Sequence, residues 1–110
     1  MRWRDVDAIL ARIVEQVRTD RVRITYHAAE EMLDEDISLG EVYHAMSNAT
    51  VLEDYPGHRR GACCLLGGRT TGGRALHIVC STDLPLAVVI TVYEPRAPKW
   101  VSETRRGEPR

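Results

Sequence analysis

The sequence predicts one α+β domain over residues 1–100, in which two or three N-terminal helices pack on one face of an antiparallel sheet of about four strands. Apolar residues recur at helical spacing in the first half of the chain and at a spacing of two after residue 50. Short glycine- and proline-containing turns separate the later segments, which favours sequential antiparallel strands. Residues 101–110 are predicted to form a polar C-terminal tail.

Three helical patterns precede the strands. Residues 5–20 repeat apolar side chains at helical spacing, and residues 27–36 form a second, shorter pattern after a short candidate strand at 22–26. Ser38 and Glu41 have the spacing of a capping box, so a third helix is predicted to begin at Ser38 and to end at Asn48.

The four predicted strands cover residues 50–55, 62–67, 74–81 and 86–93. Alternation in the last strand predicts that its even-numbered residues face the helices and its odd-numbered residues face away. The inward set is Leu86, Val88, Ile90 and Val92, and the outward set is Ala87, Val89, Thr91 and Tyr93. His77 belongs to the outward set of the preceding strand, so His77 and Tyr93 are predicted to share the open face unless a bulge intervenes.

Charge divides the chain. Residues 1–54 hold six basic and twelve acidic side chains, net −6, whereas residues 55–110 hold nine basic and four acidic, net +5. The second half is therefore a candidate surface for an anionic partner such as RNA, and an ordinary solvated charge distribution is nearly as good an interpretation. Arg59 and Arg60 stand between two glycines in a loop, where an arginine can grip a phosphate.

The remaining composition narrows the class of protein. Three cysteines without paired spacing argue against a secreted disulfide scaffold. The charged N-terminus has no signal-peptide pattern, and the longest apolar run, 84–93, is too short to span a bilayer, which predicts a cytoplasmic protein without membrane association. His77 and Cys80 point to opposite faces, and no Cys-x-x-Cys is present, so no metal or other cofactor is expected.

His27 is a second candidate functional histidine. It lies at the predicted start of the second helix, where the partial positive charge disfavours imidazolium and leaves a neutral ring able to act as a general base. The alternative is that His27 caps the helix or packs beneath it.

Four segments occur in a recognisable order: "ITYHAAEEMLDEDIS", "VLEDYPGHRR", "LHIVCS" and "VVITVYEPRAPKW". This series, over about residues 24–100, resembles a bacterial family of small uncharacterised domains in the RelE/ParE-like toxin superfamily. The chain departs from the family pattern in the second helix. Glu31 stands where members often have arginine, and residues 34–36 are acidic where members often have Glu-Arg-Gly.

The resemblance implies the toxin component of a type II toxin–antitoxin system, a metal-independent endoribonuclease that cuts mRNA. Its expected partners are RNA, including ribosome-bound mRNA, and a cognate antitoxin protein, and a homodimer is among the assemblies it allows. His27 or His77 would be the base, and Tyr93 or the other histidine the acid. The expected phosphate-binding set is Arg59, Arg60, Arg74, Arg96 and Lys99, and Tyr55 with Tyr93 would stack on a base.

A rival hypothesis keeps the same fold without catalysis. The acidic second helix and the net charge of −1 favour a protein-interaction module whose exposed sheet face or edge is occupied by a partner. A small-molecule binder using that face is a third, weaker alternative.

Overall fold

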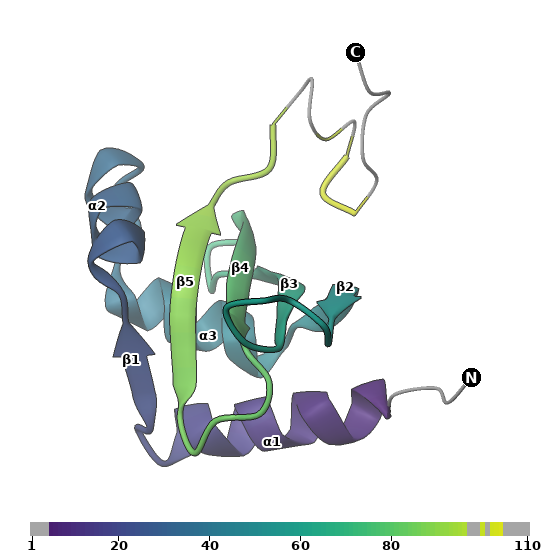
Figure 1. Ribbon diagram of the computed structural model, residues 1–110. Coiled ribbons are helices and arrows are strands. Elements are labelled where there is room, and N and C mark those ends of the chain that lie inside the picture. Colours follow the sequence, from purple (N-terminus) through teal and green to yellow (C-terminus); the bar gives the residue numbers. More distant parts are fainter. Residues whose placement is uncertain (1–4, 97–99, 101, 105–110) are drawn as a thin grey trace.

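The computed structural model describes residues 5–96, 100 and 102–104 (Figure 1). The α+β class is confirmed, with three helices and five strands in this part of the chain. In chain order the elements are α1 Val6–Arg18, β1 Val22–Ile24, α2 Tyr26–Asp34, α3 Leu39–Ser47, β2 Thr50–Tyr55, β3 Cys63–Arg69, β4 Ala75–Ser81 and β5 Ala87–Tyr93. The predicted capping box is present at the start of α3, where Ser38 and Glu41 bond each other's backbone N–H groups, and Asn48 ends the helix.

The strands form one mixed sheet in the order β1-β5-β4-β3-β2. β2 to β5 are antiparallel neighbours, as expected, but β1 adds a fifth strand that runs parallel to β5. The expectation of about four strands, all antiparallel, is therefore wrong. Backbone bonds from Ala87 to Arg21 and from Thr25 to Val89 hold β1 in place, and a pairing between segments so far apart in sequence leaves no local pattern.

Helices α1 and α3 cover one face of the sheet, while α2 lies alongside β5 beyond the end of β1 (Figure 1). Two helices, α1 and α3, thus share one face of the sheet, within the expected two or three. Among the residues described, no helix combines the length and apolar character needed to cross a membrane.

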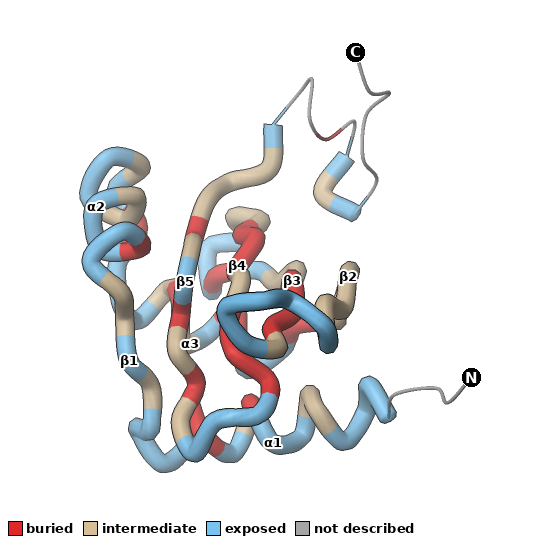
Figure 2. Tube along the Cα trace, viewed as in Figure 1, coloured by how far each residue is buried: buried red, intermediate tan, exposed pale blue. Residues whose placement is uncertain are grey.

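The core lies between the sheet and the α1–α3 layer, and the buried positions concentrate on β3, β4 and β5 (Figure 2). β3 and β4 contribute Cys64, Leu66, Leu76, Ile78 and Cys80. Gly68 brings a helix and a strand into direct contact: a Cβ added there would lie 2.1 Å from the carbonyl oxygen of Ala45 on α3.

A bulge in β5 changes the predicted faces. Thr91 pairs with Val79 and Val89 with Cys80, so Ile90 is the extra residue. Ala87 and Val89 are consequently buried in the core with Val92, whereas Val88 is half-buried and Ile90 exposed. The inward assignment of Val88 and Ile90 is therefore wrong. The bulge precedes Thr91, so the positions of Thr91 and Tyr93 relative to β4 are as predicted.

Candidate functional site

His77 and Tyr93 are direct cross-strand neighbours. They are paired in the β4–β5 register, His77 Nδ1 lies 3.2 Å from the Tyr93 hydroxyl oxygen, and the two rings meet edge to face with centroids 5.3 Å apart. The predicted shared face is confirmed for this pair. A histidine oriented by a hydroxyl at one ring nitrogen is a suitable arrangement for proton transfer at the other nitrogen.

Trp100 and Glu103, which follow β5 in the chain, cover the sheet face at His77. The indole of Trp100 stands perpendicular to the imidazole at a centroid distance of 4.3 Å, and His77 Nε2 bonds the backbone carbonyl of Glu103. His77 is consequently only 1% exposed, so the expectation of an open face is wrong at this position. A carbonyl only accepts hydrogen bonds, so Nε2 carries a proton, and in the neutral ring Nδ1 accepts from Tyr93.

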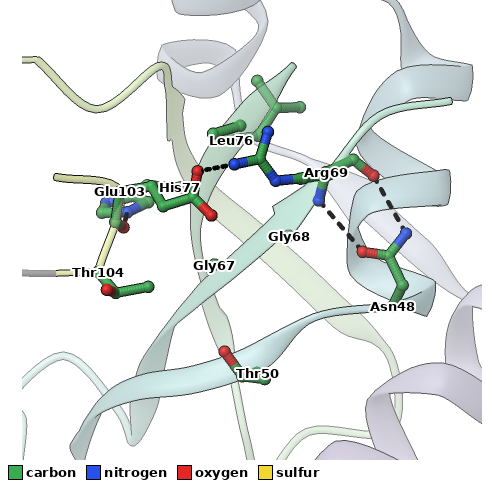
Figure 3. Close-up of a pocket in the computed structure, with 10 residues that line it drawn as sticks. Asn48, Thr50, Gly67, Gly68, Arg69, Leu76, His77, Glu103 and Thr104 are labelled. Atoms are coloured by element: carbon green, nitrogen blue, oxygen red, sulfur yellow. Dashed lines mark hydrogen bonds and ion pairs between the residues drawn. The ribbon is translucent and has the colours of Figure 1, made fainter. Parts of the chain in front are cut away.

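A pocket of about 240 Å³ lies beside His77. Its lining comes from the end of α3, from β2, β3 and β4, and from residues 103–104 (Figure 3): Asn48, Thr50, Gly67, Gly68, Arg69, Ala75, Leu76, His77, Glu103 and Thr104. Arg69 forms an ion pair with the carboxylate of Glu103. The Asn48 amide fixes the backbone of Arg69 at both its N–H and its carbonyl, each at 3.1 Å, so the residue that carries this cation is held in place.

Sequence reasoning missed Arg69. Arg69 falls between the predicted strands 62–67 and 74–81, in one of the predicted glycine-containing turns, and is in fact the last residue of β3. The available indication was a basic residue at the end of a strand adjacent to the strand of His77. Nothing in the sequence indicated its ion pair with Glu103, because 34 residues separate the two.

His27 lies in a different environment from His77. Thr25 caps α2 through a bond from the Ala28 N–H, which places His27 in the first helical turn, as predicted. Its side chain is 67% exposed, and its Nε2 lies 3.4 Å from a carboxylate oxygen of Glu31. Glu31 in turn binds the Thr91 hydroxyl and the Val92 N–H, so the structure connects His27 to β5 through this carboxylate.

Two of the predicted RNA-binding arginines make internal contacts. Arg74 pairs with the Glu94 carboxylate at 3.1 Å and donates to the carbonyls of Glu35 and Asp36. Arg96 pairs with Glu35 at 3.1 Å and with Glu94 at 3.3 Å. These contacts tie the end of α2 to the end of β5 and neutralise charge that was predicted to face RNA.

The other predicted RNA-binding residues are dispersed. Arg59 and Arg60 are exposed in the β2–β3 loop, and the hydroxyl of the half-buried Tyr55 donates a hydrogen bond to the carboxylate of Glu53. Arg60 contributes to a second pocket, of about 270 Å³, whose other wall includes the bulged Ile90. Lys99 lies outside the described residues.

The three cysteines are buried and free. Burial raises the pKa of the Cys63 thiol, and a hydrogen bond with Cys64 together with burial raises the pKa of the Cys80 thiol well above its ordinary value. Raised pKa values favour the protonated, unreactive form, so these thiols fill the sheet as small apolar groups. Across the ranges that the structure describes, no three metal-binding side chains gather into a cluster.

The fold is thus a small α+β domain with a histidine–tyrosine pair and an arginine beside a pocket on one sheet face. The chain belongs to the family described as Domain of unknown function (DUF4258), whose model matches residues 24–94. Comparisons with curated proteins and with solved structures gave no match.

Proposed function

We propose that this chain is a metal-independent endoribonuclease acting on mRNA, the RelE-like toxin component of a type II toxin–antitoxin system. The observation that carries the proposal is the His77–Tyr93 pair, with Nδ1 and the hydroxyl 3.2 Å apart and a pocket containing Arg69 alongside. A base, an oriented partner and a cation in one place are the components that phosphodiester cleavage requires.

In this reaction the ribose 2′-hydroxyl attacks the adjacent phosphorus. The hydroxyl proton passes to a base, the bond from phosphorus to the 5′-oxygen breaks, and that oxygen receives a proton, which leaves a 2′,3′-cyclic phosphate and a 5′-hydroxyl. His77 is the proposed base. With the Glu103 carbonyl displaced, the neutral ring takes the tautomer in which Nδ1–H donates to the Tyr93 oxygen, and the lone pair of Nε2 becomes available.

Two further groups complete the reaction. Tyr93 or His27 supplies the proton to the leaving oxygen, and the pocket arginine Arg69 stabilises the charge on the phosphate. Arg59 and Arg60, exposed in the loop at the other end of β3, bind the RNA backbone away from the cleaved bond. General acid–base steps of this kind each contribute ~10²–10⁴-fold in rate.

Induced expression in a bacterium tests the proposal. The wild type is expected to arrest growth and to fragment cellular mRNA, whereas His77→Gln and Tyr93→Phe are expected to do neither. His44→Gln and Tyr26→Phe are matched controls, because both side chains are exposed and lie on helices away from the pair. Normal growth and intact mRNA with abundant, folded wild-type protein would overturn the proposal.

A second candidate is a non-catalytic protein-interaction module of the same fold. The observation that favours it is the closed sheet face, in which Trp100 and Glu103 cover His77 and the charges of Arg74 and Arg96 are paired. This candidate predicts that His77→Gln and Tyr93→Phe behave like the wild type in the expression experiment, provided that all three proteins are folded.

A further inference from the structure

The C-terminal segment places one residue against both polar groups of the pocket. Glu103 contacts His77 Nε2 through its backbone carbonyl and Arg69 through its carboxylate. Figure 3 shows this carboxylate directed at the guanidinium, with Thr104 further along the same wall. A carbonyl oxygen and a carboxylate on one residue present to these groups what the oxygens of a phosphodiester would present: acceptors for a ring N–H and for a planar guanidinium.

We infer that the pocket between Arg69 and His77 is a phosphate subsite for RNA, and that Glu103 occupies it as an internal competitor for the phosphate. The inference deepens the proposed function and depends on it for the identity of the ligand. Arg69 is the residue that binds the phosphate, and the Nε2–H that His77 gains when it accepts the 2′-hydroxyl proton is the second donor.

The shape of the pocket suits a small anionic group. At about 240 Å³ it is smaller than the about 300–1,000 Å³ typical of sites for drug-sized ligands. Gly67 contributes no side chain to the lining of the pocket. A Cβ added at Gly67 would lie 2.8 Å from the side-chain carbon Cδ1 of Leu52. The lining also includes the side chain of Thr50, whose hydroxyl can bond an oxygen of the sugar–phosphate backbone.

Displacement of Glu103 by a phosphate is energetically accessible. The side chains of Arg69 and Glu103 are 54% and 41% exposed, and ion pairs with this exposure are weak because water screens both charges. Arg69 is also held independently of Glu103, since its guanidinium donates to the Gly73 carbonyl at 2.5 Å and its backbone is fixed by Asn48. The cation therefore remains in position when Glu103 leaves.

Binding of an uncleavable RNA tests the inference separately from catalysis. The probe is a short, fluorophore-labelled oligoribonucleotide with a 2′-O-methyl group on every sugar. Its binding affinity is measured by fluorescence anisotropy over a range of salt concentrations. Arg69→Gln is expected to weaken binding and to reduce the slope of log affinity against log salt by about 0.7, the loss of one phosphate contact on a single strand. Glu103→Gln is expected to strengthen binding by about 2- to 5-fold, since the competing carboxylate is removed.

Matched controls are Arg23→Gln and Glu30→Gln, which alter exposed residues on β1 and α2. Three outcomes would each overturn the subsite. Arg69→Gln would bind with unchanged affinity and salt slope, Glu103→Gln would bind with unchanged affinity, or Glu103→Gln would not bind at low salt. If the two variants behave as expected but no RNA is cleaved, the subsite stands and the ribonuclease proposal fails. If RNA is cleaved and both variants bind like the wild type, the ribonuclease proposal stands and the subsite fails.

Discussion

The carboxylate of Glu31 accepts a hydrogen bond from the backbone N–H of Val92 at 3.0 Å. One helical turn later, Glu35 accepts from the N–H of Glu94 at the same distance. Four helical residues rise about 6 Å and two strand residues advance about 6.6–6.8 Å, so the two carboxylates match alternate N–H groups of the strand. Helix α2 and its C-cap residue thereby cap the edge of β5 beyond the end of β1, which gives Glu31 and Glu35 a structural role.

Glu31→Ala is expected to lower the free energy of unfolding by about 1–3 kcal/mol, because the Val92 N–H loses its partner at a buried position. Urea unfolding measures the change. Glu30→Ala, on the exposed side of the same helix, controls for the loss of a glutamate from α2. Equal stability of the two variants would show that the edge does not depend on the Glu31 carboxylate.

Gly68→Ala is expected to destabilise the fold by about 1–3 kcal/mol, because the added methyl group collides with the backbone of α3 at Ala45. Thermal unfolding is a sufficient measurement. At Gly57 an added Cβ meets nothing within 4 Å, so Gly57→Ala is the matched control and should leave the melting temperature nearly unchanged. A Gly68→Ala protein as stable as this control would contradict the close packing of α3 on β3.

Tyr43 makes stability depend on pH in the alkaline range. Burial, and then the hydrogen bond to Asp20, raises the pKa of Tyr43 from 10 to about 12. The folded state therefore holds this proton more tightly than the unfolded state, so the contribution is complete below pH 10 and is lost as the pH rises towards 12. The difference in unfolding free energy between the wild type and Tyr43→Phe should be constant below pH 10 and should fall above it. A difference that does not vary up to pH 12 would refute the raised pKa.

The cysteine thiols are expected to react slowly with a thiol reagent such as dithionitrobenzoate in the native protein and rapidly in urea. The reactive species is the thiolate, and burial disfavours it at Cys63 and Cys80. Absorbance of the released chromophore gives both rates. Rapid reaction of any of the three thiols under native conditions would show that the sheet opens there.

The sequence predicted most of the fold because local patterns determine most of its elements. The capping box at Ser38 located α3, and alternation placed Cys80 on the face opposite to His77, where it is buried in the core. The bulge at Ile90 could not be predicted, because Val88, Val89 and Ile90 are all apolar and either face suits them.

Long-range contacts limited the prediction of the site. His77 and Tyr93 were placed together because the period of two extends across a single hairpin. The cover on His77 comes from Trp100 and Glu103, beyond the last strand, where no periodic pattern exists to indicate their position. The acidic partners of Arg74 and Arg96 could not be predicted either, because the positions of charged residues in a sequence do not indicate which of them form ion pairs.

Cleavage of ribosome-bound mRNA by the purified protein tests the central claim most directly, with the product ends identified and His77→Gln compared with wild type and His44→Gln. We predict fragments that end in a 2′,3′-cyclic phosphate, formed by the wild type and by His44→Gln and ~10²–10⁴-fold more slowly by a folded His77→Gln variant. Wild-type rates in His77→Gln, ends without a cyclic phosphate, or no cleavage by the wild type would contradict the claim.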